Sequence, residues 1–133
     1  MIADLKYAGI PFLGLLAVHY WFVVRDNEGT CERWEVWQRT NVGGKSVGHV
    51  YRNLMSTDSN VGGGPTHLAT QWTDADAVRI AKVLRESWDR YPYCHWYRMM
   101  PGPNSNTFVA WVLAQAGINY ELSHRGIGKN FLR

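Results

Sequence analysis

Residues 101–109 have the sequence Pro-Gly-Pro-Asn-Ser-Asn-Thr-Phe-Val, and this stretch decides how the chain is interpreted. It passes from a Pro/Gly-rich breaker directly into an apolar segment, which places Ser105 at the N-terminus of a predicted helix. Free backbone N–H groups and the helix dipole favour negative charge there. Ser105 is therefore a candidate helix cap or a candidate nucleophile. Asn104 and Asn106 are candidates to donate to an oxyanion or to support the site.

Two helices are predicted in the second half of the chain. One runs from Ser105 to Ala116, with Gly117 as its stop. The other begins after Thr73, which we expect to cap it, and its apolar residues recur at helical spacing as far as the terminator Tyr91-Pro92.

The first half of the chain is rich in strand signals. Residues 17–24 alternate so that His19, Trp21 and Val23 share one face. A second strand over 32–38 completes a hairpin, and a third is expected over 47–54 after a loop at 41–44. A further short strand is predicted over 118–122.

This order of elements predicts a single α+β domain over residues 1–133, with an antiparallel sheet packed against helices. Residues 1–16 are interpreted as an N-terminal lead-in and residues 17–133 as the core. The apolar segment 7–24 has about the length of a membrane span or signal peptide, but Pro11, Gly14 and a histidine interrupt it. A lead-in followed by a buried strand is favoured, and an association with a membrane or cell envelope stays open.

The amino-acid composition limits the classes of ligand and cofactor that the protein is expected to bind. The hydrophobic fraction of 46% excludes disorder, and the net charge of +3 comes from scattered residues, so no nucleic acid is expected. Cys31 and Cys94 are too few and too far apart for a zinc site, and the glycines at 62–64 lack a phosphate-loop motif. We therefore expect no metal and no cofactor, and a small molecule, peptide or lipid as the substrate or ligand.

A nucleophile needs a base, and the base needs a group that orients it. His19 is the candidate base, because it is a lone polar residue in an apolar strand. Glu35 or His49 is the candidate orienting residue, while Trp21 and Trp37 are candidates for the lining of a substrate cleft. Each residue also has a purely structural interpretation. The histidines could be core residues, Glu35 a solvated strand residue, and the tryptophans packed core rings.

Three stretches together resemble a known bacterial family. They are His19-Tyr20-Trp21, Trp34-Glu35-Val36 and the run over 101–108, and they resemble the family catalogued as domain of unknown function thirty-seven-fifty. The resemblance extends from about Val18 to Leu113. That family carries no assigned activity, and it implies a bacterial protein of the cytoplasm or the cell envelope.

A more distant resemblance concerns chemistry. Residues 104–109 are similar to the Asn-Cys-x-x-Phe-Val helix start of circularly permuted NlpC-like and lecithin-retinol-acyltransferase-like proteins. It implies a circularly permuted papain-like fold, in which His19 is the base and Glu35 or His49 orients it. The resemblance implies a hydrolase or acyltransferase acting on an amide or ester; the alternative is an inactive module that binds a peptide, glycan or lipid.

The departure from that pattern is Ser105, where those proteins have cysteine. A thiol beside a histidine readily becomes a thiolate, whereas a hydroxyl needs a base that removes its proton during attack. Three interpretations stay open: Ser105 is a working nucleophile activated by a histidine, the fold has lost catalysis and now binds a ligand, or serine has been introduced in place of cysteine.

Overall fold

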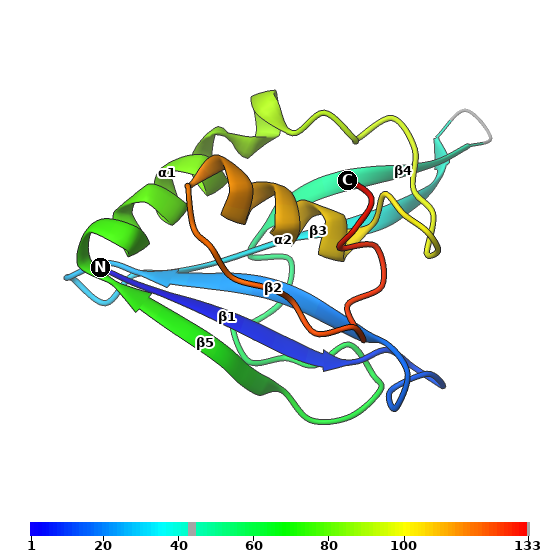
Figure 1. Ribbon diagram of the computed structural model, residues 1–133, viewed down its shortest axis with the longest axis horizontal. Coiled ribbons are helices and arrows are strands. Elements are labelled where there is room, and N and C mark those ends of the chain that lie inside the picture. Colours follow the sequence, from blue (N-terminus) through cyan, green and yellow to red (C-terminus); the bar gives the residue numbers. More distant parts are fainter. Residues whose placement is uncertain (43–44, 133) are drawn as a thin grey trace.

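The computed structural model describes residues 1–42 and 45–132 and contains one antiparallel sheet with two helices on one of its faces (Figure 1). The strand order is β4-β3-β2-β1-β5. The prediction of an α+β domain with an antiparallel sheet packed against helices is confirmed. The elements are β1 (Ile2–Gly9), β2 (Val18–Arg25), β3 (Cys31–Val42), β4 (Lys45–Arg52), β5 (His67–Thr73), α1 (Asp74–Arg90) and α2 (Ser105–Gln115).

The alternation predicted for β2 sets the two sides of the core. Tyr20, Phe22 and their neighbours at even positions pack with α1 and α2 in the main hydrophobic cluster. Trp21 and Val23 lie on the opposite face, in a small cluster with Ala8 of the neighbouring strand, and Val61 packs against this cluster. A strand buried on both faces is nearly continuous in apolar residues, which is the composition of β2.

The predicted lead-in over residues 1–16 is wrong for its first half, because Ile2–Gly9 forms strand β1 between β2 and β5. Leu5 is fully buried in the core. The sequence did not predict this strand because it contains the charged residue Asp4. In the structure the Asp4 carboxylate is buried and accepts hydrogen bonds from Arg25 and Gln71. Among the described residues, no helix is long and apolar enough to span a membrane.

Other sequence predictions have mixed outcomes. Both helices are confirmed, although the Thr73 side chain makes no capping hydrogen bond. The short strand over 118–122 is wrong, because this segment turns back from the end of α2, where the Ile118 N–H donates to the Leu113 carbonyl. Strand β5 was not predicted; it is an edge strand with much of its surface exposed. Residues 43 and 44 of the predicted loop lie outside the described residues.

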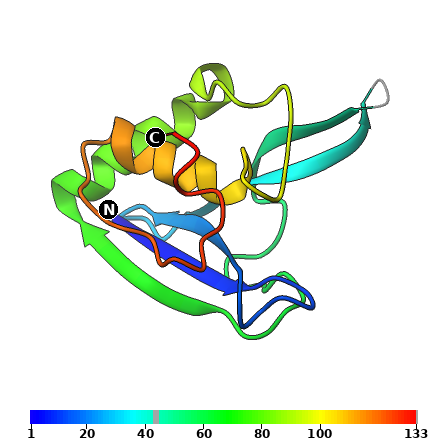
Figure 2. The same cartoon turned by 45° about the vertical axis from the view of Figure 1, so that its right-hand side comes forward.

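The sheet opens between β2 and β3, and this opening positions the rest of the molecule. The two strands pair only where Phe22–Arg25 meets Cys31–Trp34. Beyond that point β3 continues with β4 as a hairpin that diverges from β2 (Figures 1 and 2). The N-terminus of α2 lies against the unpaired part of β2.

Asn106 takes the place of the missing strand partner. Its side-chain Oδ1 accepts a hydrogen bond from the Tyr20 backbone N–H at 3.0 Å, and its Nδ2 donates to the Val18 carbonyl at 2.8 Å. Nδ2 also donates to the Ile127 carbonyl at 3.0 Å, which ties the C-terminal segment to the same point. A side-chain amide presents one donor and one acceptor in the way that a neighbouring strand does.

We predict that Asn106→Ala lowers the free energy of unfolding by about 2–4 kcal/mol, because it leaves buried backbone groups of β2 unpaired. Asn119→Ala is the matched control; Asn119 is exposed, so its loss should cost less than about 0.5 kcal/mol. Urea denaturation of the two variants checks this, and equal stabilities would contradict the role assigned to Asn106.

Candidate active site

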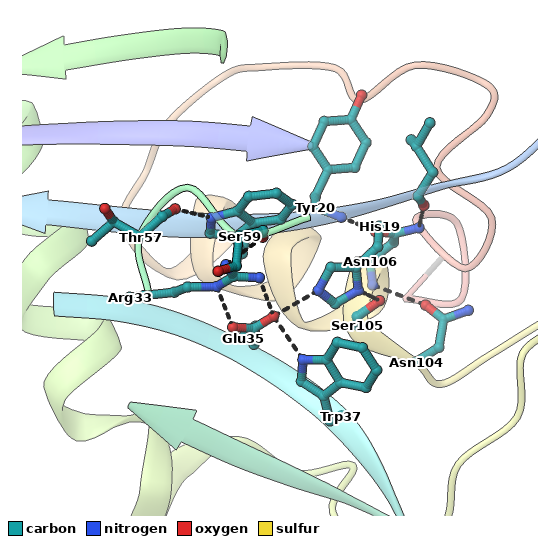
Figure 3. Close-up of polar contacts among 12 residues, drawn as sticks. His19, Tyr20, Arg33, Glu35, Trp37, Thr57, Ser59, Asn104, Ser105 and Asn106 are labelled. Carbon is teal, nitrogen blue, oxygen red and sulfur yellow. Dashed lines mark hydrogen bonds and ion pairs between the residues drawn. The ribbon is translucent and has the colours of Figure 1, made fainter. Parts of the chain in front are cut away.

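Ser105 and His19 meet at the opening between β2 and β3. Ser105 is the first residue of α2, and His19 lies on β2. The Oγ of Ser105 is 2.8 Å from Nδ1 of His19 (Figure 3). Both side chains are buried, so the contact is shielded from bulk water.

The other ring nitrogen of His19 contacts Glu35. Nε2 of His19 is 2.8 Å from Oε1 of Glu35, and a carboxylate accepts this hydrogen bond (Figure 3). With Nε2 as the donor, the neutral ring presents Nδ1 as an acceptor to the Ser105 hydroxyl. Glu35 therefore fixes the tautomer that a general base requires.

Glu35 is itself held by its neighbours on β3. Arg33 donates two hydrogen bonds to the carboxylate, from Nε at 2.5 Å and from Nη2 at 2.9 Å. The indole of Trp37 donates a further one at 2.7 Å. Since Arg33, Glu35 and Trp37 alternate along one strand, the pleat places all three on the same face.

Burial alone would raise the pKa of the Glu35 carboxyl, but hydrogen bonds and electrostatic interactions with His19 and Arg33 outweigh it and lower this pKa to about 2. Glu35 is therefore an anion at neutral pH. An anion beside Nε2 stabilises the imidazolium that forms when Nδ1 takes a proton.

Arg33 is fully buried and is held from two further sides. Its Nη1 donates to the backbone carbonyls of Ser56 and Ser59, and its guanidinium carbon lies 4.1 Å from the centroid of the Trp21 ring. The Trp21 indole in turn donates to the Thr57 carbonyl. The loop that follows β4 thus closes over the buried ion pair.

Trp21 and Trp37 have different positions. Trp37 lines the cleft beside the site, as predicted, and its ring centroid is 5.1 Å from that of His19. Trp21 lies beneath Arg33, is fully buried and is not among the residues that line this cleft. Its prediction as a cleft residue is wrong, because the Trp21 ring packs against the Arg33 guanidinium and has no exposed surface.

His49 does not orient His19. It lies on β4 opposite Trp37, and its ring packs against Tyr51 with centroids 4.5 Å apart. Of the two candidates, Glu35 alone forms a described hydrogen bond with the imidazole.

Asn104, and not Ser105, caps the helix. Its Oδ1 accepts from the N–H groups of Asn106 and Thr107, and its Nδ2 donates to the carbonyls of Met99 and Ile127. The side-chain amide of Asn106 is likewise fully used, since it forms hydrogen bonds with backbone groups of β2. Neither side-chain amide has a free N–H for an oxyanion, and both residues support the site by tying the start of α2 to neighbouring segments.

Tyr97 is a site residue that the sequence analysis missed. Its hydroxyl interacts with both the backbone N–H and the Oγ of Ser105. Burial raises the pKa of Tyr97, and these hydrogen bonds offset the rise only in part, so the phenol keeps its proton. The only sequence signal was its place in the aromatic-rich segment 93–100, which connects α1 to α2.

A cleft of about 230 Å³ opens beside these groups. Its walls are predominantly apolar, and they come from the loop between β1 and β2, from β3 and from the connector before α2. The lining includes Ile10, Pro11, Leu13, Ala17, Val61, Met99, Met100 and Ile127, together with His19, Trp37, Tyr97 and Ser105.

The two cysteines do not belong to this group of site residues. Cys31 and Cys94 are free thiols, and burial raises the pKa of Cys94. Within the part of the chain that the structure describes, no cluster of three His, Cys, Asp or Glu side chains is arranged to hold a metal ion.

Comparison with known proteins gives one match. The family model described as Protein of unknown function (DUF3750) matches residues 1–131 of the chain. No curated protein and no solved structure matches it.

The low pKa of Glu35 predicts an acid-sensitive contribution to stability. A carboxyl whose pKa is lower in the folded state stabilises the fold above its unfolded value, here 4.5, and loses that contribution as the pH falls toward 2. Between pH 5 and pH 3 the wild type should lose about 2 kcal/mol more than Glu35→Gln, as measured by urea denaturation.

At neutral pH the same Gln variant should be less stable by about 3–5 kcal/mol, because Arg33 is left as a buried charge without its anion. Parallel acid profiles for the wild type and the variant would contradict the state assigned to Glu35.

Proposed function

The chain belongs to the family described as Protein of unknown function (DUF3750), as its sequence resemblance indicated, and we propose that it is a serine hydrolase or acyltransferase acting on an ester or amide bond. One observation carries the proposal. His19 lies between Ser105 and Glu35, with 2.8 Å hydrogen bonds on both sides. A nucleophile, a base and an orienting anion in contact are the requirements of acyl transfer.

The proposed reaction begins at the hydroxyl of Ser105. Its Oγ attacks the carbonyl carbon of the substrate while Nδ1 of His19 takes the hydroxyl proton. The imidazolium then gives this proton to the leaving alcohol or amine, and the acyl group stays on Ser105. Water then attacks the acyl carbon in a hydrolysis, or a second alcohol or amine does so in a transfer, and each loses a proton to His19. The bond between the acyl carbon and Oγ breaks, and His19 returns the proton to Ser105.

The oxyanion of the tetrahedral intermediate needs hydrogen-bond donors. We assign this role to the backbone N–H of Ser105 and the hydroxyl of Tyr97, which contact each other beside Oγ; the oxyanion would take the place of that contact. The next two N–H groups of α2, from Asn106 and Thr107, are occupied by the Asn104 cap. Tyr97 thus replaces the amide donors expected from the sequence.

We include the circularly permuted papain-like fold in this proposal. The order of histidine, orienting residue and nucleophile along the chain supports it, as does the nucleophile at a helix N-terminus facing a histidine on a strand. In chymotrypsin-like enzymes the base nitrogen is Nε2 and the orienting carboxylate contacts Nδ1. Here the two nitrogens exchange roles, which favours an origin separate from those enzymes.

The alternative is an inactive module that binds a ligand in the apolar cleft. Such a module needs the cleft walls but has no need of a buried ion pair behind the histidine. Burying a charge pair carries a desolvation cost that well-packed apolar residues avoid. Base orientation explains the presence of Arg33 and Glu35, and ligand binding alone does not.

A fluorophosphonate probe tests the proposal, since it modifies serines that a base activates. We expect one label per chain on Ser105, and loss of labelling in Ser105→Ala and His19→Ala. Ser123→Ala and His95→Ala are the matched controls, because both residues are exposed, and these variants should label like the wild type. Absence of labelling in a folded wild type that still binds an apolar ligand would favour the module instead.

Tyr97→Phe tests the oxyanion assignment. Removing one donor should lower kcat by about 10²–10³-fold with little change in KM, because the hydroxyl acts on the transition state. Tyr93→Phe is the matched control, since Tyr93 lies in the same connector and packs against Tyr91 and Phe131. Steady-state hydrolysis of an activated ester measures both variants, and equal kcat values would remove Tyr97 from the mechanism.

A further inference from the structure

The loop between β1 and β2 presents large apolar side chains to solvent. Phe12, Leu15 and Leu16 are 105%, 91% and 71% exposed. They lie within a segment of seven residues, Ile10–Leu16, which we call the apolar loop. Single exposed apolar residues are ordinary, but three on one short loop mark a contact surface.

The apolar loop is held in place by its backbone. The N–H of Ile10 donates to the Ala17 carbonyl across its base, and the N–H of Leu13 donates to the Ile10 carbonyl within it. Phe12 adopts φ 66°, a conformation that a residue with a side chain pays for in strain. The loop is therefore built to direct these side chains outward.

Glycines fix the apolar loop against the rest of the molecule. A Cβ added to Gly9 or Gly14 would lie within 2.7 Å of the Gly63 carbonyl oxygen, so these backbones approach too closely for any side chain. Within the glycine run at 62–64, the backbone of Gly63 is therefore the surface against which the apolar loop packs.

One cationic side chain is bound to the apolar loop. Residues 7–24 and 59–66, which contain the loop and the glycines packed against it, include no Asp, Glu, Lys or Arg. The charged side chain bound to the loop is Arg125, whose Nη2 donates to the Gly14 carbonyl. An uncharged apolar tip beside an arginine is complementary to hydrocarbon beneath an anionic headgroup.

The apolar loop is continuous with the candidate active site. Leu13 belongs to the loop and also lines the cleft that contains Ser105 and His19. Met99 and Met100, which are 53% and 70% exposed, line the same cleft. The mouth of the cleft therefore lies next to the exposed apolar side chains.

We propose that the apolar loop docks the protein on an anionic lipid bilayer, with Phe12, Leu15 and Leu16 inserted and Arg125 near the headgroups. The shape favours a bilayer over a second copy of the chain. The loop projects beyond the ends of β1 and β2 (Figures 1 and 2), whereas a stable dimer needs a face of about 800 Å² on each partner. A narrow projection inserts into a bilayer readily.

Docking would place the cleft at the membrane surface, where an acyl chain can enter it between Leu13 and the two methionines. The substrate class that follows is an acyl ester or amide of a lipid, and this step rests on the proposed function. Docking itself does not rest on it.

Flotation with vesicles of equal parts phosphatidylcholine and phosphatidylglycerol tests the docking. The wild type should float with the vesicles, and Phe12→Ser/Leu15→Ser/Leu16→Ser should lower the partition constant at least about tenfold. The matched control is Leu54→Ser/Leu68→Ser/Val78→Ser, which removes three exposed apolar side chains elsewhere and should float like the wild type. Circular dichroism verifies that each variant is folded.

Ser105→Ala separates docking from catalysis, because it should float like the wild type whether or not the chain is an enzyme. A wild type that does not float, or a loop variant that floats equally well, would overturn the proposal. A further outcome would also overturn it: sedimentation equilibrium shows a dimer that the loop substitutions dissociate, and neither the wild type nor any variant binds vesicles.

Discussion

The replacement of a strand by the side chain of Asn106 is the constraint on which the rest of this structure depends. Where β3 leaves β2, the backbone of β2 would be left with unpaired groups in a buried place. The amide of Asn106 satisfies them and thereby fixes the start of α2 within the opening. The position of Ser105 follows, since it precedes Asn106 and has no freedom to move away from His19.

Strand β3 supplies the second half of the site because of the same divergence. Freed from β2, it presents Arg33, Glu35 and Trp37 on one face, with their donors converging on a single carboxylate. A serine depends on its base more strictly than a cysteine does, since it forms no thiolate-like ion pair at neutral pH. A rigidly held anion behind the histidine is the support that such a serine needs.

The sequence predicted the residues that meet but not how their neighbours are used. His19, Glu35 and Ser105 could be selected because each is polar at an apolar or helix-initiating position. The roles of Asn104 and Asn106 depend on carbonyls contributed by distant segments, which no local pattern reveals. Strand β1 was missed for a similar reason, because the partners of Asp4 lie on other strands.

The most direct test of this account is the mass of the protein during turnover of an activated ester. Rapid acid quenching followed by mass spectrometry should show one acyl group per chain, and peptide mapping should place it on Ser105. The adduct should be absent from His19→Ala. An unmodified wild type during turnover, or an acyl group on another residue that persists without His19, would contradict the central claim that His19 activates Ser105 as a nucleophile.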